Sequence, residues 1–168
     1  HPAVLEPIKR LAEMGFSVEI LSPGPDGIVR VETVAAALRP DTLLVSMMQV
    51  NNETGAIQPI AEVGALLAAQ NHKIYFHVDG VQGFGKLPCP VRKWGVQLYT
   101  ASGHKIHGPK GIGLLYCAKG VRLRPLVVGG GQEKDLRSGT ENMPGIVGFA
   151  TAATEAYQEM AQRTARVQ

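Results

Sequence analysis

Short apolar runs alternate with amphipathic segments along most of the chain, and this alternation restricts the possible folds more than any other feature. Runs typical of buried strands end at Met48, Asp79, Ala101 and Cys117. Apolar residues at helical spacing lie at 2–14, 34–38 and 60–67, and again from about Met143 to Met160. Strands that alternate with helices predict an α/β fold, with a mainly parallel sheet flanked by helices.

Two further segments complete the expected layout. Phe16–Leu21 alternates apolar and polar residues before the turn cluster Ser22–Gly27, so a strand is expected there. The chain starts at His1, and the final helix carries a polar tail from Glu155 to Gln168 with nothing to pack against. We therefore expect residues 1–168 to be part of a larger domain.

Composition narrows the classes of partner. With 45% hydrophobic and 18% charged residues in 168, the chain can bury a core. The net charge of +3 comes without a long basic run, which argues against nucleic acid and leaves room for a small anion such as a phosphorylated cofactor. The sequence holds two cysteines without a C-x-x-C spacing, no long apolar span and no signal peptide pattern, so a reduced, cytoplasmic protein without membrane association is expected.

The loop Ser102–Ile112 places a lysine between two histidines where a strand ends. Pyridoxal phosphate needs an amine for a Schiff base, an acid beside the pyridine nitrogen and donors for the phosphate. Lys105, Asp79 and the pair Ser102 and His104 supply these groups at expected strand ends. The alternative is that Lys105 is a solvated loop lysine, because the ordinary lysine pKa of about 10.4 leaves little free amine near neutral pH.

Neighbouring polar residues bear on this interpretation. Gln82 follows Asp79 by three residues, so both can face one ligand from a turn. Asn51 and Asn52 follow another strand, where they either contact a ligand or form a turn. A phosphate-binding P-loop is excluded, because Pro109 stands where that motif requires a lysine.

A metal-dependent hydrolase is the alternative from a different class. His77 and Asp79 lie on the same face of a strand, and His104 and His107 add two nitrogen ligands. Against this reading, Lys105 would place a cation beside the metal ion. Single histidines near strand ends are also more often hydrogen-bonded structural groups than metal ligands.

Several motifs in a fixed order, spread over almost the whole chain, extend the pyridoxal phosphate interpretation. Together they resemble the central part of a NifS/IscS-type cysteine desulfurase, in the class V aminotransferase group of fold-type I pyridoxal phosphate enzymes. The residues that carry the resemblance are His1 before the first helix, Val50–Gly55, His77–Asp79 with Gln82, Ser102–Gly111, Gly129–Glu133 and Arg137–Asn142.

The resemblance implies a role for most of these residues. Lys105 would hold the cofactor as a Schiff base and move the substrate proton, while Asp79 would pair with the pyridine nitrogen. Gln82 would bond the ring hydroxyl, and His1 would stack on the ring and assist proton transfer. The remaining members of the implied set are Asn52 near the cofactor and the substrate carboxylate, Ser102 and His104 on the phosphate, and Thr140 on the phosphate of the partner subunit in a homodimer.

The implied reaction removes sulfur from L-cysteine to give L-alanine and an enzyme persulfide, for a sulfur-acceptor protein such as an iron–sulfur scaffold. The relatives are more than twice this length, so residues 1–168 are expected to be a partial cofactor-binding large domain. The N-terminal segment, the small C-terminal domain and the persulfide cysteine would then lie outside it, and the chain alone would be inactive. Cys89 and Cys117 do not match that cysteine and are expected to be structural. A selenocysteine lyase, a class V aminotransferase and a non-catalytic binding module are the remaining alternatives.

Overall fold

A four-stranded sheet forms the centre of the computed structural model, which describes residues 1–165. Within these residues the strand order is β1-β2-β3-β4, with β1, β2 and β3 parallel and β4 antiparallel to β3. The predicted mainly parallel sheet flanked by helices is therefore confirmed. The bounds are β1 Leu44–Met48, β2 Tyr75–Asp79, β3 Leu98–Ser102 and β4 Gly113–Cys117.

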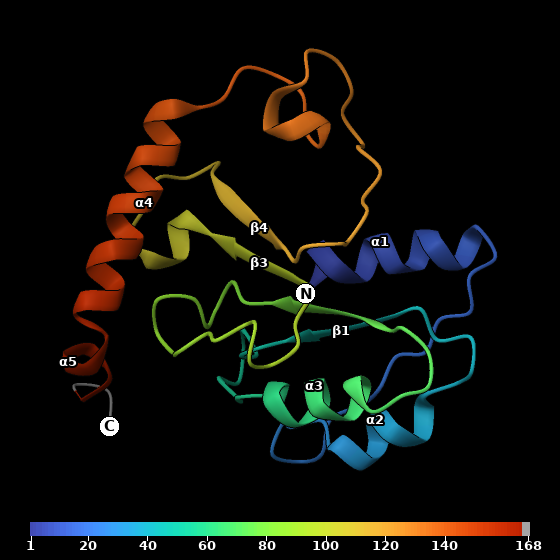
Figure 1. The fold of residues 1–168 in the computed structure, drawn as a ribbon. Helices are drawn as coiled ribbons and strands as arrows, with labels where there is room; N and C mark the ends of the chain where they lie inside the picture. The colour runs from blue at the N-terminus through green and yellow to red at the C-terminus, as the bar shows by residue number, and fades with distance from the viewer. Residues whose placement is uncertain (166–168) are drawn as a thin grey trace.

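Helices lie on both sides of the sheet and at one of its ends (Figure 1). The short helix α2 packs against α3, and α3 contacts β2, so both cover one face. Helix α4 packs against the 3-10 turn η1 that directly follows β3. The bounds are α1 Pro2–Glu13, α2 Val31–Ala37, α3 Ile60–Ala68, η1 Gly103–Ile106, η2 Gln132–Asp135, α4 Met143–Gln158 and α5 Met160–Ala165.

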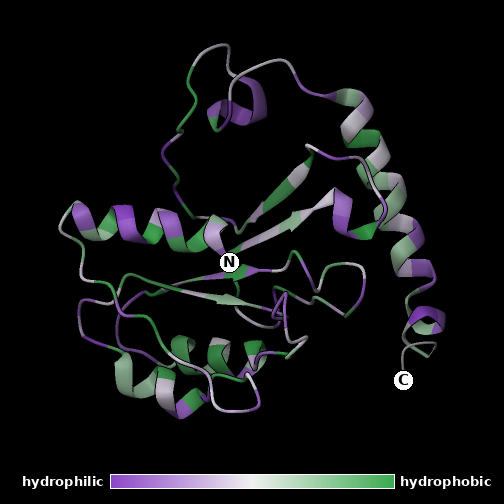
Figure 2. Ribbon diagram, turned by 180° about the vertical axis from the view of Figure 1, so that it is seen from behind, coloured by the Kyte–Doolittle hydropathy of each residue, from purple (hydrophilic) through white to green (hydrophobic). Residues whose placement is uncertain are grey.

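The alternation of side chains along β2 separates the core from the polar face. Phe76 and Val78 are fully buried and belong to the same hydrophobic cluster as Val63 of α3. Figure 2 shows the corresponding concentration of hydrophobic residues on α3. Since successive strand residues point to opposite faces, His77 and Asp79 share the face away from that cluster. The sequence of β2 therefore presents its polar residues together on one side.

The expected strand at Phe16–Leu21 does not form, and this prediction was wrong. The segment makes no ladder with any strand in the described part of the chain, and Phe16, Val18 and Ile20 are exposed. The guanidinium of Arg39 bonds the Ser17 hydroxyl at 2.8 Å, which fixes the segment through a side chain. Apolar alternation is a local property, whereas a strand also needs a neighbouring backbone that can pair with it.

The final helix begins at Met143, as the spacing predicts. Val147 is 58% exposed and Ala150 is also exposed, whereas Gly145, Phe149 and Ala156 are buried. This buried face packs against η1. A break at Glu159 separates α4 from α5, and residues 166–168 of the expected helix lie outside the described part.

Among residues 1–165, no helix combines the length and the apolar character needed to cross a bilayer.

Candidate active site

The carboxyl ends of β2 and β3 deliver the predicted site residues to one edge of the sheet. Asp79 is the last residue of β2 and pairs in register with Thr100 of β3. Ser102 ends β3, and the 3-10 turn that follows contains His104 and Lys105. In open α/β sheets ligands bind outside this edge, because the strand ends leave room for loops there. The structure thus gathers the predicted amine, carboxylate and phosphate donors in one region.

Asp79 is a buried carboxylate without a cation. Asp79 is only 5% exposed, and its Oδ1 accepts a hydrogen bond from the backbone N–H of Val81 at 3.1 Å. No lysine, arginine or histidine in residues 1–165 forms an ion pair with it. An isolated buried charge is costly, and a cationic ligand would compensate it.

Glycines make the turn after Asp79 possible. A side chain at Gly80 would overlap the phenol ring of Tyr99, and one at Gly83 would overlap the amide of Gln49. These two neighbours are themselves joined, because the Tyr99 hydroxyl donates to Oε1 of Gln49 at 2.7 Å. The turn therefore rests directly on a buried polar pair, which fixes the direction in which the chain leaves β2.

Gly80→Ala should destabilise the protein by roughly 2–4 kcal/mol, because the new methyl group and the buried ring of Tyr99 cannot both keep their positions. The midpoint of urea unfolding would measure this loss. In a Tyr99→Leu background the smaller side chain leaves space for the methyl group, so the additional cost of Gly80→Ala should fall well below its value in the natural sequence. An equal cost in both backgrounds would contradict the packing argument.

Gln82 is oriented by a residue that the sequence analysis did not select. The ammonium of Lys86 donates to Oε1 of Gln82 at 3.2 Å. Because an ammonium can only donate, this bond commits the amide oxygen and leaves the NH₂ group for another acceptor. Burial, followed by the charge of Lys105, lowers the pKa of the Lys86 side chain, so the two amines lie close enough to interact. The i,i+4 spacing of Gln82 and Lys86 was the available sequence signal.

The start of the lysine loop is held by a short polar contact. The Ser102 hydroxyl and Nδ1 of His104 lie 2.8 Å apart, and His104 and Lys105 are both exposed. Ile106 of the same turn is buried and anchors it. His107 ends the turn with a left-handed backbone, φ 67°. The lysine is thus presented to solvent from a turn whose other side is packed.

His77 lies between two hydroxyl groups on neighbouring strands. Its Nδ1 is 2.7 Å from the Ser46 hydroxyl of β1, and its Nε2 is 3.3 Å from the Thr100 hydroxyl of β3. Burial lowers the pKa of the His77 imidazole, and the negative charge of Asp79 opposes part of that change. Sequence reasoning missed Ser46 and Thr100, since their pairing with His77 depends on strand register.

The hydrolase alternative receives no support from this geometry. In the part of the chain that the structure describes, no three metal-ligating side chains gather into a site. Both ring nitrogens of His77 contact hydroxyl groups, and Nδ1 of His104 contacts Ser102. His77 and Asp79 do share a face of β2, but His104 and His107 belong to a different loop.

Three other predicted residues are not brought into this cluster by any contact within residues 1–165. His1 caps α1, where its Nδ1 accepts from the Ala3 N–H at 3.1 Å. Asn52 is exposed in a turn that its neighbour Asn51 stabilises through bonds of 2.9 Å to two backbone N–H groups. Thr140 is exposed in the segment before α4, which extends beyond the β4 edge of the sheet (Figure 1).

Both cysteines are free thiols within the fold. Cys89 Sγ lies 2.6 Å from the Tyr157 hydroxyl of α4, beside an aromatic cluster centred on Phe84. Burial and this contact with Cys89 raise the pKa of Tyr157. Cys117 ends β4 and is half-buried. These surroundings agree with the expectation that both side chains serve the structure.

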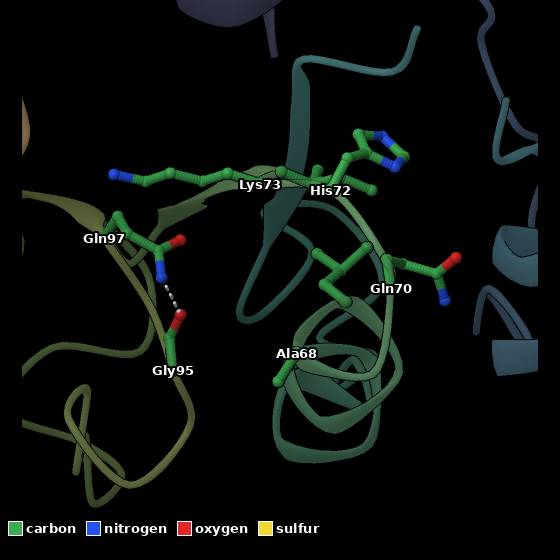
Figure 3. A pocket seen from close by; sticks show the side chains of 9 residues that line it. Ala68, Gln70, His72, Lys73, Gly95 and Gln97 are labelled. Carbon is green, nitrogen blue, oxygen red and sulfur yellow. Dashed lines mark hydrogen bonds between the residues drawn. The ribbon is translucent and has the colours of Figure 1, made fainter. Parts of the chain in front are cut away.

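A hollow of about 360 Å³ lies at the opposite end of the strands, where α3 ends and β2 approaches (Figure 3). Its polar residues already have partners. His72 contacts the carbonyl of Thr42 at 3.1 Å, and Gln97 bonds the Gly95 carbonyl at 2.7 Å. Lys73 extends away over the ring of Tyr75, 4.7 Å from its centre. Because its polar groups are already paired, this hollow is not a candidate site.

Comparison with known proteins agrees with the geometry. A model of the aminotransferase class-V family matches residues 1–167. The putative cysteine desulfurase IscS 1 of Bacillus subtilis is 46% identical over 168 residues, which are 100% of this chain and 44% of that protein. The chain therefore spans less than half the length of this relative.

Solved structures give the same result. A NifS-like protein is 46% identical with a TM-score of 0.93, over 96% of this chain and 44% of that one. A structure of SspA in complex with cysteine is 42% identical with a TM-score of 0.87, over 92% of this chain and 44% of that one. The family match over residues 1–167 leads to one conclusion: the chain belongs to the class-V aminotransferase family, and within it is similar to NifS/IscS-type cysteine desulfurases.

Proposed function

We propose that the protein containing this chain is a pyridoxal phosphate-dependent cysteine desulfurase, and that residues 1–168 are part of its cofactor-binding large domain. The observation that carries the proposal is the buried Asp79 carboxylate, which has no cation in residues 1–165 and ends β2 beside the strand that leads to Lys105. Membership of the family supports the same assignment.

The residues present are suited to the cofactor. A protonated pyridine nitrogen would compensate the Asp79 charge, and the free NH₂ group of Gln82 would donate to the ring hydroxyl. Ser102 and His104, 2.8 Å apart, would bind the phosphate. When bound, the cofactor would supply an electron sink that stabilises negative charge on the substrate carbon.

The chain's own residues would perform the remaining tasks. Lys105 would attach the cofactor and afterwards hold the proton that moves to and from the substrate carbon. The exposure of its side chain leaves the amine accessible for both steps. His1 would stack on the ring and assist proton transfer, and Asn52 would bind the substrate carboxylate. Thr140 would contact the phosphate held by the other subunit, so the active form would be a homodimer.

The proposed substrate is L-cysteine, the compound with which the related SspA structure was solved. Its carbon–sulfur bond breaks, the sulfur passes to an enzyme thiol as a persulfide, and the carbon takes a proton to give L-alanine. We propose that this thiol is neither Cys89, which contacts Tyr157, nor Cys117. The persulfide would then serve an acceptor such as an iron–sulfur scaffold, in the cytoplasm.

The test is to supply the intact gene product with L-cysteine, pyridoxal phosphate and a thiol reductant. Equal amounts of L-alanine and sulfide are expected. A much higher rate with L-selenocysteine would assign the protein as a selenocysteine lyase, and keto-acid formation would assign it as an aminotransferase. The proposal would be contradicted by a protein that binds no cofactor, releases no alanine from L-cysteine or L-selenocysteine, and forms no keto acid.

Ser102→Ala should weaken the affinity for pyridoxal phosphate about tenfold, since one hydrogen bond to a charged phosphate is lost. The affinity for pyridoxal, which lacks the phosphate, should hardly change. Titration of the visible absorption with each compound gives both dissociation constants. An equal loss for both compounds would show that Ser102 supports the loop rather than the phosphate.

A further inference from the structure

The side chain of His77 lies on the same face of β2 as the Asp79 carboxylate, two residues before it. Both lie on the polar face of β2, two residues apart, which corresponds to about 6.6 Å along a strand. The register pairs Ser46 with His77 and Asp79 with Thr100, so the ring spans three strands beneath the edge where Asp79 ends β2. Asp79, the proposed partner of the cofactor ring, thus ends the strand next to this row.

Hydroxyl groups occupy both sides of the ring. Ser46 is 2.7 Å from Nδ1 and Thr100 is 3.3 Å from Nε2. A neutral imidazole has one nitrogen that donates and one that accepts. One of the two hydroxyl groups can accept from the N–H and the other can donate to the bare nitrogen, so both ring nitrogens are hydrogen-bonded. Neither carries a charge that would favour an imidazolium ion. The row therefore holds the ring in place without charging it.

Asp79 is the charged group that acts on this ring. The neighbours from β1 and β3 do not titrate near neutral pH, and Tyr75 on the same face of β2 is a phenol covered by Lys73 at 4.7 Å. Burial lowers the pKa of His77 and outweighs the attraction of Asp79. The imidazole is therefore neutral at neutral pH.

We propose that His77 is a positioning residue for Asp79: a neutral imidazole held by hydroxyl groups leaves the carboxylate free of any cation from the protein, so the pyridinium of the cofactor becomes its partner. This inference rests on the proposed function. A protonated ring at this distance would compete for the same negative charge. As the pH falls through the lowered pKa of His77, the ring gains a proton and the attraction of Asp79 for the pyridinium weakens.

The test compares two ligands that differ at one ring atom. Pyridoxamine 5′-phosphate has the ring nitrogen, and its 1-deaza analogue has carbon there, while both carry the same phosphate and amine. The ratio of their dissociation constants measures selectivity for the pyridinium, and contributions from His104 and the phosphate cancel in it. For the natural protein this ratio should fall about tenfold as the pH falls from neutral through the lowered pKa of His77, as expected for a new unit charge at this separation.

His77→Gln is the decisive variant, because an amide can bond both hydroxyl groups but cannot take up a proton in this range. In this variant the ratio of the two dissociation constants should lose most of the tenfold fall that is expected for the natural protein over the same pH range. His72→Gln, a histidine at the other end of the sheet that contacts the Thr42 carbonyl, is the matched control and should behave like the natural protein.

A second measurement needs no variant. The pKa of His77, followed by NMR of its ring proton, should fall when pyridoxamine phosphate binds and should not fall with the deaza analogue, since coupling between two sites is reciprocal. If neither ligand binds, the proposed function fails. If pyridoxamine phosphate binds but the ratio and the pKa of His77 do not respond as described, the role of His77 is refuted and the proposed function stands.

Discussion

Replacing Lys105 by alanine should abolish covalent attachment of pyridoxal phosphate and lower the rate of alanine formation by on the order of a thousandfold or more. The reason is that one amine would serve twice, first as the point of attachment and then as the base for the substrate proton. Loss of the visible absorption band, and of the mass increase after borohydride reduction, would show the missing bond directly.

Lys110 provides a matched control for this experiment. It is also exposed and lies in the same loop, five residues further along the chain. Lys110→Ala should therefore keep the absorption band, the borohydride product and most of the activity. If Lys105→Ala still carried the cofactor on another lysine with full activity, the assignment of the amine would be wrong.

Replacing Asp79 by asparagine should weaken the binding of pyridoxamine phosphate by about a hundredfold, because the pyridinium loses its buried counter-charge. The same change should leave the unliganded protein as stable as before or more stable by roughly 1 kcal/mol, since a buried charge without a cation is removed. Opposite effects on ligand affinity and on the free energy of unfolding are the signature of a residue kept for binding.

Asp41→Asn is the control, because this exposed carboxylate is paired with Arg39 at 2.7 Å. It should alter neither the ligand affinity nor, beyond about 0.5 kcal/mol, the unfolding free energy. A marked loss of stability in unliganded Asp79→Asn would instead indicate that the carboxylate supports the turn at Val81. Urea unfolding with and without ligand separates these outcomes.

Periodicity was sufficient to locate most elements. The runs that end at Met48 and Asp79 became β1 and β2, and the helix predicted from Met143 starts at that residue. The strand expected at Phe16–Leu21 was wrong because pairing depends on a neighbouring backbone, which alternation does not report. The spacing did not show which face of α4 is buried, since contacts with η1 decide this.

In the candidate site, too, the sequence selected some residues and missed others. Residue types and motif order selected Lys105, Asp79 and the Ser102 and His104 pair, and the structure brings them to one edge of the sheet. Lys86 was missed because the i,i+4 spacing to Gln82 does not by itself show that the two side chains are hydrogen-bonded. The roles of His1, Asn52 and Thr140 remain predictions from the resemblance, since they make no contact with this group within residues 1–165.

The sequence by itself determined the α/β class and the order of most elements, and it selected a candidate amine and a candidate carboxylate, because these follow from local periodicity and residue chemistry. Only the tertiary structure decided that Asp79 is buried without a cation and that His77 contacts Ser46 and Thr100 rather than a metal ion. Charge compensation and strand register join residues far apart in the chain. Their free energies depend on what surrounds each group in space, and no local pattern in the sequence specifies those surroundings.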